Sequence, residues 1–209
     1  MTTLPLPALA LPPGRRSPVL AALAAASFAV LGQSPARAGD SCTAKSARTM
    51  TPVVELYTSE GCNSCPPADR WLSRLKADPG VVALAFHVDY WDRLGWKDRF
   101  ASSAFTERQA EQQASNGARF SYTPQVVVDG VDRKDWSSLG AAAVGRAGKI
   151  APVEVGLARE GSQVVATIAA SSGAPRRLAA YWAVTEQDYA TAVKAGENQG
   201  VTLHHDFVV

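Results

Sequence analysis

The segment TSEGCNSCPPADRW, residues 58–71, decides the fold of this chain because it places two cysteines directly after a buried-strand pattern. Residues 53–58 (VVELYT) are rich in β-branched and aromatic residues, which predicts a short buried strand. A helical pattern then runs from Cys62 to about Ala77, where an Asp-Pro-Gly turn ends it. The segment therefore predicts a strand, a turn and a helix that begins at the first cysteine.

The C-x-x-C pair has the spacing that a redox-active dithiol needs. At a helix start, Cys62 would face backbone N–H groups and the positive end of the helix dipole, which lower the pKa of a thiol. Cys62 is therefore the predicted nucleophile, and Cys65, one turn further on the same face, the predicted resolving thiol. The pair would alternate with a Cys62–Cys65 disulfide and carry two electrons itself, so no bound cofactor is expected.

Three other interpretations of the pair stay open. One is a structural disulfide, although C-x-x-C closes too small a loop to stabilise much through chain entropy. A second is binding or delivery of a soft metal such as copper(I), for which the two thiolates need a third ligand and His87 is the candidate. The third is a non-catalytic interaction module with oxidised cysteines. Thiol–disulfide exchange needs an exposed Cys62, whereas metal delivery needs a third ligand.

Residues 53–150 predict one α/β domain with the order β-α-β, then α, then β-β-α. After the first helix we expect a strand at 81–88, a helix from Ser102 or Ser103 to about Asn116, strands at 125–129 and 131–134, and a helix at 137–149.

Two features predict where a substrate would bind. Thr123-Pro124 lies directly before a strand, and a cis bond there would leave the Thr123 backbone free to hold an extended chain beside the sulfurs. The loop at 89–101 carries aromatic side chains that either bind substrate or cap the core: Tyr90, Trp91, Trp96 and Phe100.

Two ionisable residues are candidates for tuning the thiols. Glu55 lies in the strand before the cysteines, where a buried carboxylate can move protons during resolution, unless it is solvated or salt-bridged. His87 lies near the end of the second strand, at the edge where such sheets carry active sites, unless it is a satisfied buried histidine. We expect Glu60 to be a turn residue and His205 to be structural.

The first 38 residues have the pattern of a secretory signal peptide. Two arginines precede an apolar run at 19–31, and Ala-Arg-Ala follows at 36–38. We expect an exported protein, periplasmic or secreted, with residues 39–52 as a tether and no membrane span after the signal is removed. All three cysteines lie in the exported part, and the odd count leaves Cys42 over.

Residues 39–209 carry 18 Lys and Arg against 19 Asp and Glu, so no basic surface for a nucleic acid is expected. Beyond Pro152 the pattern alternates in four segments, VEVGLA, QVVATIAA, RLAAYWAVT and TLHHDFVV. Alternation is typical of half-buried antiparallel strands, so residues 151–209 predict a small β-rich module.

The strand, the C-x-x-C at a helix start and the Thr-Pro before a hairpin together resemble the thioredoxin-like superfamily. VVELYTSEGCNSC is similar to the active-site strand and turn of glutaredoxins. More closely, the chain resembles a family of exported bacterial thioredoxin-like proteins of unknown function in the motifs VELYTSEGCNSCPPADRWL, FHVDYWDRLGWKDRF, YTPQVVVDG and VKAGENQGVTLHHDFVV. The resemblance spans residues 53–209 and implies a thioredoxin-like fold.

That resemblance also implies a thiol–disulfide oxidoreductase that acts on protein thiols or disulfides and is reset by a redox partner. It implies no particular substrate. The dipeptide Asn63-Ser64 is neither the Gly-Pro of reducing thioredoxins nor the Pro-His of strongly oxidising relatives. Since the stability of the thiolate sets redox poise, the direction of electron flow is left open.

Overall fold

The computed structural model describes residues 2–5, 41–140 and 148–209. The predicted signal peptide at 1–38 lies outside the described residues except for 2–5, and so do residues 141–147 of the last predicted helix. The chain forms two compact units, one of Met1–Ala47 with Pro152–Pro175 and one of Arg48–Ala151 with Arg176–Val209. No helix in the described ranges is long and apolar enough to cross a membrane.

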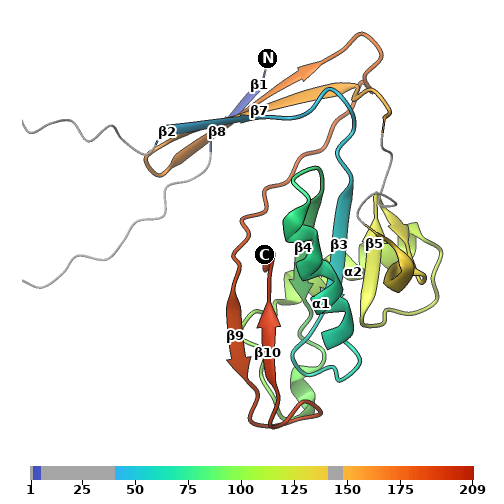
Figure 1. The fold of residues 1–209 in the computed structure, drawn as a ribbon. Helices are drawn as coiled ribbons and strands as arrows, with labels where there is room; N and C mark the ends of the chain where they lie inside the picture. Colours follow the sequence, from blue (N-terminus) through green and yellow to red (C-terminus); the bar gives the residue numbers. More distant parts are fainter. Residues whose placement is uncertain (1, 6–40, 141–147) are drawn as a thin grey trace, which may run out of the picture. The chain divides into compact units, whose positions relative to one another are not determined.

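The larger unit contains a mixed four-stranded sheet in the order β4-β3-β5-β6 (Figure 1). Its strands are β3 (Val53–Thr58), β4 (Val82–His87), β5 (Gln125–Val128) and β6 (Val131–Asp132). β3 and β4 are parallel, whereas β5 is antiparallel to both β3 and β6. Asp129 and Gly130 form the tight turn between β5 and β6 with φ of 49° and 80°, which confirms the predicted hairpin.

The described residues of the larger unit form two α-helices, α1 (Pro66–Ser73) and α2 (Ser103–Ser115). α1 continues as the 3-10 turn η1 (Arg74–Ala77). The Oγ of Ser102 accepts a hydrogen bond from the Ala104 amide, so α2 begins at the predicted cap. Two more short 3-10 turns lie at η2 (Asp92–Leu94) and η3 (Trp136–Ser138).

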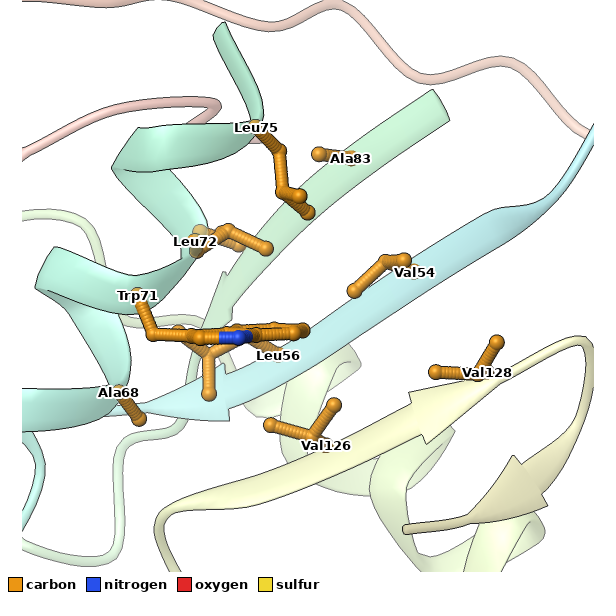
Figure 2. Packing of buried hydrophobic residues seen from close by; sticks show 10 residues of the cluster. Val54, Leu56, Ala68, Trp71, Leu72, Leu75, Ala83, Val126 and Val128 are labelled. Carbon is orange, nitrogen blue, oxygen red and sulfur yellow. The ribbon is translucent and has the colours of Figure 1, made fainter. Parts of the chain in front are cut away.

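The two faces of the sheet are covered because side chains alternate along β3. Val54 and Leu56 point to α1, where they form a cluster with Trp71 and Leu72 (Figure 2). The indole of Trp71 reaches across the sheet, and its Nε1–H donates to the Leu139 carbonyl at 2.9 Å. On the other face, buried residues of a second cluster pack with Phe105 of α2: Tyr57, Leu84, Phe86, Val88 and Val127. The end of β3 is therefore held firmly from both sides.

The C-terminal residues from Arg176 on belong to this unit, and the chain passes from one unit to the other at 47/48, 151/152 and 175/176. β9 (Tyr189–Ala192) and β10 (Thr202–His205) form an antiparallel hairpin, and β10 packs against α1 (Figure 1). Val208 then pairs with Ala85, so the end of the chain adds to the free edge of β4. The predicted module at 151–209 is divided because its last part completes this sheet.

The smaller unit is an antiparallel sheet in the order β1-β8-β7-β2. Its strands are β1 (Thr2–Pro5), β2 (Ser41–Lys45), β7 (Val153–Glu160) and β8 (Gln163–Ala170). β2 lies in the segment predicted as a tether, and β1 lies in the predicted signal peptide. The segments VEVGLA and QVVATIAA are therefore strands, as predicted.

RLAAYWAVT, the third alternating segment, is not a strand, and that prediction is wrong. Alternating apolar residues give a segment one apolar face, but they do not provide a neighbouring strand. A strand also needs such a neighbour as the hydrogen-bond partner of its backbone. Several of its apolar side chains are exposed instead: Leu178, Tyr181, Trp182 and Val184.

We predict that Leu72→Ala destabilises the protein by about 2–5 kcal/mol, because it removes a fully buried side chain beneath α1. Urea-induced unfolding followed by circular dichroism measures the loss. The matched control is Leu178→Ala, whose side chain is exposed and should change stability by less than about 0.5 kcal/mol. Equal losses for the two variants would contradict the assignment of this core.

Candidate functional site

Cys62 and Cys65 are joined by a disulfide in the turn that follows β3. The turn is closed by backbone hydrogen bonds from the Cys62 amide to Ser59 and from the Cys65 amide to the Cys62 carbonyl, each 3.2 Å. Both cysteines have 0% exposed surface. The exposed Cys62 that exchange chemistry needs is therefore not present in this conformation, although its neighbours Asn63 and Ser64 are exposed.

Helix α1 begins at Pro66 and not at Cys62 as predicted, with Cys65 as its N-cap. The reason is that Pro66 and Pro67 lack an N–H, so the first amides to enter the helix are those of Ala68 and Asp69, which donate to the Cys65 carbonyl. The helix start thus lies next to Cys65. Cys62 lacks the two N–H groups that a proline-free first turn would have directed toward it.

A loop from the C-terminal hairpin binds the cysteine turn. The Nδ2 of Asn198 donates to the carbonyls of Glu60 and Cys62, at 2.8 and 3.0 Å. The adjacent Glu197 accepts a hydrogen bond from the Asn63 amide at 3.2 Å. We call residues 193–201, which connect β9 to β10, the clamp loop. It satisfies buried carbonyls of the turn that have no ladder partner.

Thr123 and Pro124, the segment predicted to hold substrate, lie beside the cysteine turn. Thr123-Pro124 is a cis peptide, which confirms that inference. The Nε1–H of Trp91 donates to the Thr123 Oγ1 at 2.8 Å, and the Ser64 hydroxyl donates to the Thr123 carbonyl at 3.5 Å. The same Ser64 Oγ lies 3.3 Å from the Cys62 Sγ. Thr123, Trp91 and the disulfide therefore share one small region.

Trp91 also restricts the residue before Cys62. A Cβ added to Gly61 would lie 3.0 Å from the Trp91 Cβ, so only glycine fits there without a shift. Tyr90 has a different role, because its hydroxyl donates to the Gln109 Oε1 on α2 at 3.2 Å. Gln109 in turn donates to the Tyr122 carbonyl at 2.7 Å, next to the Thr-Pro segment. Both aromatic rings pack on the α2-side core while they support the site.

Glu55, a predicted tuning residue, is engaged elsewhere. Its carboxylate forms an ion pair with Arg108 of α2 and accepts hydrogen bonds from the hydroxyls of Tyr57 and Tyr181 at 3.0 and 3.2 Å. None of these partners belongs to the cysteine turn. The salt-bridged alternative is thus the one that the structure supports for Glu55.

His87, the second predicted tuning residue, is buried and paired with Asp98. Its Nδ1 lies 2.7 Å from the Asp98 Oδ2, which also accepts the Glu60 amide at 2.9 Å. Burial lowers the pKa of His87, but the hydrogen bond and charge of Asp98 more than offset this, so the pKa is raised. Burial likewise raises the pKa of Asp98, and the bond to His87 outweighs it, so that pKa is lowered. The two shifts agree on an ion pair.

Glu60 is fully buried and forms a second imidazole–carboxylate pair. Its Oε1 lies 3.1 Å from the Nε2 of His205 on β10, and its Oε2 accepts the Trp96 Nε1–H at 2.7 Å. Burial raises the Glu60 pKa, but these hydrogen bonds outweigh it and hold the pKa below its ordinary value. The prediction of Glu60 as a plain turn residue misses this role.

The two pairs form one buried polar cluster beside the disulfide. The rings of His87 and His205 lie 5.1 Å apart, and Phe100 packs on both at 5.2 and 5.4 Å. Phe100 therefore packs on this cluster and Trp96 donates to its Glu60, contacts that agree with the core-capping alternative for these two residues. Sequence reasoning missed the cluster members Glu60, Asp98 and His205 and the neighbouring Asn198. The only signal was that all four lie inside motifs of the quoted resemblance.

The copper hypothesis needs a third ligand, for which His87 is the candidate. The Nδ1 of His87 is taken by Asp98. In the part of the chain that the structure describes, no group of three or more His, Cys, Asp or Glu side chains is placed to hold a metal ion.

These features define a mixed α/β protein with a C-x-x-C disulfide at the end of a central strand. The chain belongs to the DUF1223 family, described as proteins of unknown function, whose model matches residues 53–209. This agrees with the predicted resemblance to a family of unknown function.

Among solved structures, an Agrobacterium tumefaciens protein determined by a structural genomics consortium is 46% identical over 40% of this chain and 37% of its own, with a TM-score of 0.37. No curated protein matches this chain.

We predict that Asn198→Ala loosens the cysteine turn, because the buried Glu60 carbonyl loses its donor and the Cys62 carbonyl keeps only the Cys65 amide. The expected loss of stability is about 1–3 kcal/mol, and dithiothreitol should reduce the disulfide several-fold faster. Stopped-flow reduction and urea unfolding measure the two effects. Gln199→Ala, an exposed neighbour on the same loop, is the control. If both variants were reduced at the wild-type rate, the clamp loop would not restrict the disulfide.

A second prediction concerns pH. Because the folded-state pKa of His87 is raised, the stability from its pair with Asp98 is fully present below the unfolded pKa of about 6.5 and is lost as pH rises through the folded pKa. Urea unfolding between pH 5.5 and 9 should show this fall, and Asp98→Asn should flatten it. The control, His204→Asn, changes an exposed histidine and should keep the wild-type slope. A slope unaltered by Asp98→Asn would contradict the buried ion pair.

Proposed function

We propose that this protein is an exported thiol–disulfide oxidoreductase in which Cys62 and Cys65 exchange with protein thiols or disulfides. One observation carries the proposal: the two cysteines are bonded to each other in the turn between β3 and α1, beside Thr123. A disulfide across so short a loop adds little stability through chain entropy. The exchange of two electrons between its dithiol and disulfide forms is therefore the better explanation for its presence.

The arrangement of the larger unit supports a thioredoxin-like core. Two parallel strands, β3 and β4, are connected through α1, and the antiparallel hairpin β5-β6 lies on the other side of β3. The cysteine turn follows the carboxyl end of β3, the edge at which open α/β sheets place their sites. The Thr123-Pro124 segment enters β5 at that same edge, since β5 runs antiparallel to β3.

In the proposed reaction Cys62 is the nucleophile. Its thiolate attacks one sulfur of a substrate disulfide, a Cys62–substrate disulfide forms, and the other substrate sulfur leaves as a thiolate that takes a proton. The Cys65 thiolate then attacks the Cys62 sulfur, which re-forms the internal disulfide and releases the second substrate sulfur. The Ser64 hydroxyl, 3.3 Å from the Cys62 Sγ, donates to the thiolate in this scheme. A separate redox partner returns the protein to the dithiol.

Substrate access is the step that needs movement, because both sulfurs are covered. The clamp loop holds the turn through Glu197 and Asn198, so its displacement would uncover Cys62. After this displacement an extended peptide could pass between the turn and Thr123. A folded protein surface would also need this displacement before it could reach the sulfur.

The contacts around Asn63 favour the reducing direction. Glu197 accepts the Asn63 amide, which removes a donor from the vicinity of Cys62 and adds a carboxylate. The two prolines that begin α1 remove two more donors. A thiolate with few donors is poorly stabilised, and dithiols of that kind have low reduction potentials.

The deciding experiment is a redox titration in glutathione buffers, read by thiol trapping at Cys62 and Cys65. We expect a reversible two-electron transition between roughly −120 and −270 mV, nearer to the lower value. Cys42→Ser should leave the midpoint unchanged because Cys42 is an exposed thiol outside the pair. Cys65→Ser should stop catalysed reduction of a protein disulfide. A midpoint below about −300 mV without exchange would instead identify an inert structural disulfide.

A further inference from the structure

The burial of both sulfurs creates a need for a proton carrier. Opening the disulfide converts two sulfurs with no exposed surface into two thiols, which take up protons at neutral pH. Uncovering the Cys62 side for substrate leaves Cys65 buried at the N-cap of α1. A protein side chain is therefore the available route for the Cys65 proton.

Asp69 is the acidic residue that helix geometry brings next to Cys65. Cys65 has helical dihedral angles, φ −77° and ψ −37°, and its carbonyl accepts the Asp69 amide at 3.2 Å. The two residues are thus four positions apart on one continuous turn. Their Cβ atoms lie about 5–6 Å apart on the same face of the helix.

Asp69 is also influenced by the buried polar cluster. The groups that act on the pKa of its carboxyl come from three strands, namely Thr58 on β3, His87 on β4 and His205 on β10, together with Asp98, which is paired with His87. Burial is the largest effect on its carboxyl, and it raises the pKa despite the opposing effect of the two imidazoles. A raised pKa makes a carboxyl better able both to accept and to return a proton during turnover.

Two buried imidazole nitrogens of the cluster, the His87 Nε2 and the His205 Nδ1, have no hydrogen-bond partner among the described residues. Each imidazole has its other nitrogen bound to a carboxylate. Buried atoms of this kind are rare in native structures and are costly unless they have a role. Here they can stabilise the Asp69 carboxylate when Asp69 loses its proton.

Asp69 has a path to solvent as well. It lines a small pocket of about 80 Å³ between α1 and β10, together with Pro66, Arg70 and residues 201–204. The half-buried residue therefore lies between the covered dithiol and the surface.

We propose that Asp69 is the proton carrier of the dithiol and exchanges a proton with Cys65 in each turnover. The proposal rests on the proposed thiol–disulfide exchange and gives Asp69 the task that sequence reasoning offered to Glu55, whose carboxylate is held by Arg108. In resolution, Asp69 takes the Cys65 thiol proton, and the thiolate attacks the Cys62 sulfur. The bond from Cys62 to substrate breaks, its electron pair stays on the substrate sulfur, and Asp69 releases the proton through the pocket.

The reverse reaction uses the same group. An external thiolate attacks the Cys62 sulfur, the Cys62–Cys65 bond breaks with its electron pair on the Cys65 sulfur, and protonated Asp69 gives its proton to that thiolate. Asp69 then regains a proton from solvent. The imidazole pairs of His87 and His205 do not change partners in either direction.

The test is the reaction of the reduced Cys42→Ser protein, which lacks the exposed third thiol, with Ellman's reagent. One thionitrobenzoate is released when Cys62 attacks and a second when Cys65 resolves the mixed disulfide. We expect Asp69→Asn to slow the second release roughly 100-fold at pH 6 to 7 and to leave the first within twofold. Its second-phase rate should rise in proportion to hydroxide, whereas the wild-type rate should level off. Asp69→Glu should restore much of the second phase.

The controls separate this idea from a structural role. Glu111→Gln removes an exposed acid on α2 and should keep both wild-type phases. If Asp69→Asn kept the wild-type second phase and pH profile, or slowed both phases equally, the proposal would be overturned. The assay uses a small reagent, so it reports on Asp69 even if the redox titration shows that the protein does not exchange with protein disulfides.

Discussion

The hydrogen bonds from Asn198 to the carbonyls of Glu60 and Cys62 are the interaction on which the site depends. These carbonyls lie in a buried turn that belongs to neither the sheet ladder nor the helix, and the Glu60 carbonyl has Asn198 as its donor while the Cys62 carbonyl also accepts the Cys65 amide. A buried unsatisfied carbonyl costs about 1–3 kcal/mol, so the loss of Asn198 would destabilise the turn at Glu60. The hairpin β9-β10 therefore completes the larger unit and positions the cysteines.

The same hairpin determines the electrostatics of the site. His205 enters from β10 to meet Glu60, and His87 meets Asp98 from the opposite strand. Neither carboxylate could be buried as an anion alone, because desolvation would raise its pKa and leave it neutral. Each imidazole removes that cost. The cluster is therefore held together by two pairs, one within residues 87–98 and one that joins Glu60 to His205 across 145 positions.

Sequence reasoning reached those parts of the fold that short-range patterns specify. The strands before and after α1, the Asp129-Gly130 hairpin and the Ser102 cap each follow from a local signal, and all are present. The start of α1 at Pro66 also has a local signal, since two consecutive prolines supply no helical amide and the helix cannot include the cysteines before them.

The rest of the site depends on contacts that no local pattern encodes. Glu60 reads as a turn residue because its partners lie 38 and 145 positions away, and Asn198 lies in what reads as a polar connection. The alternating segment with Tyr181 predicted a strand because the spacing of hydrophobic residues contains no information on whether a neighbouring strand exists. The contacts of such residues can be recognised only in the folded structure, where β10 packs against α1.

Access and protonation are coupled in this arrangement because they share one hairpin. Asn198 of the clamp loop covers the turn, and His205 at the end of the following strand holds Glu60. In the proposed exchange, a movement that uncovers Cys62 releases the hydrogen bonds of the clamp loop, whereas Asp69 stays in the small pocket that it lines with Pro66 and Leu203. We therefore expect substrate entry to uncover the proposed nucleophile without hydrating the whole cluster, since Phe100 and Trp96 still contact its members.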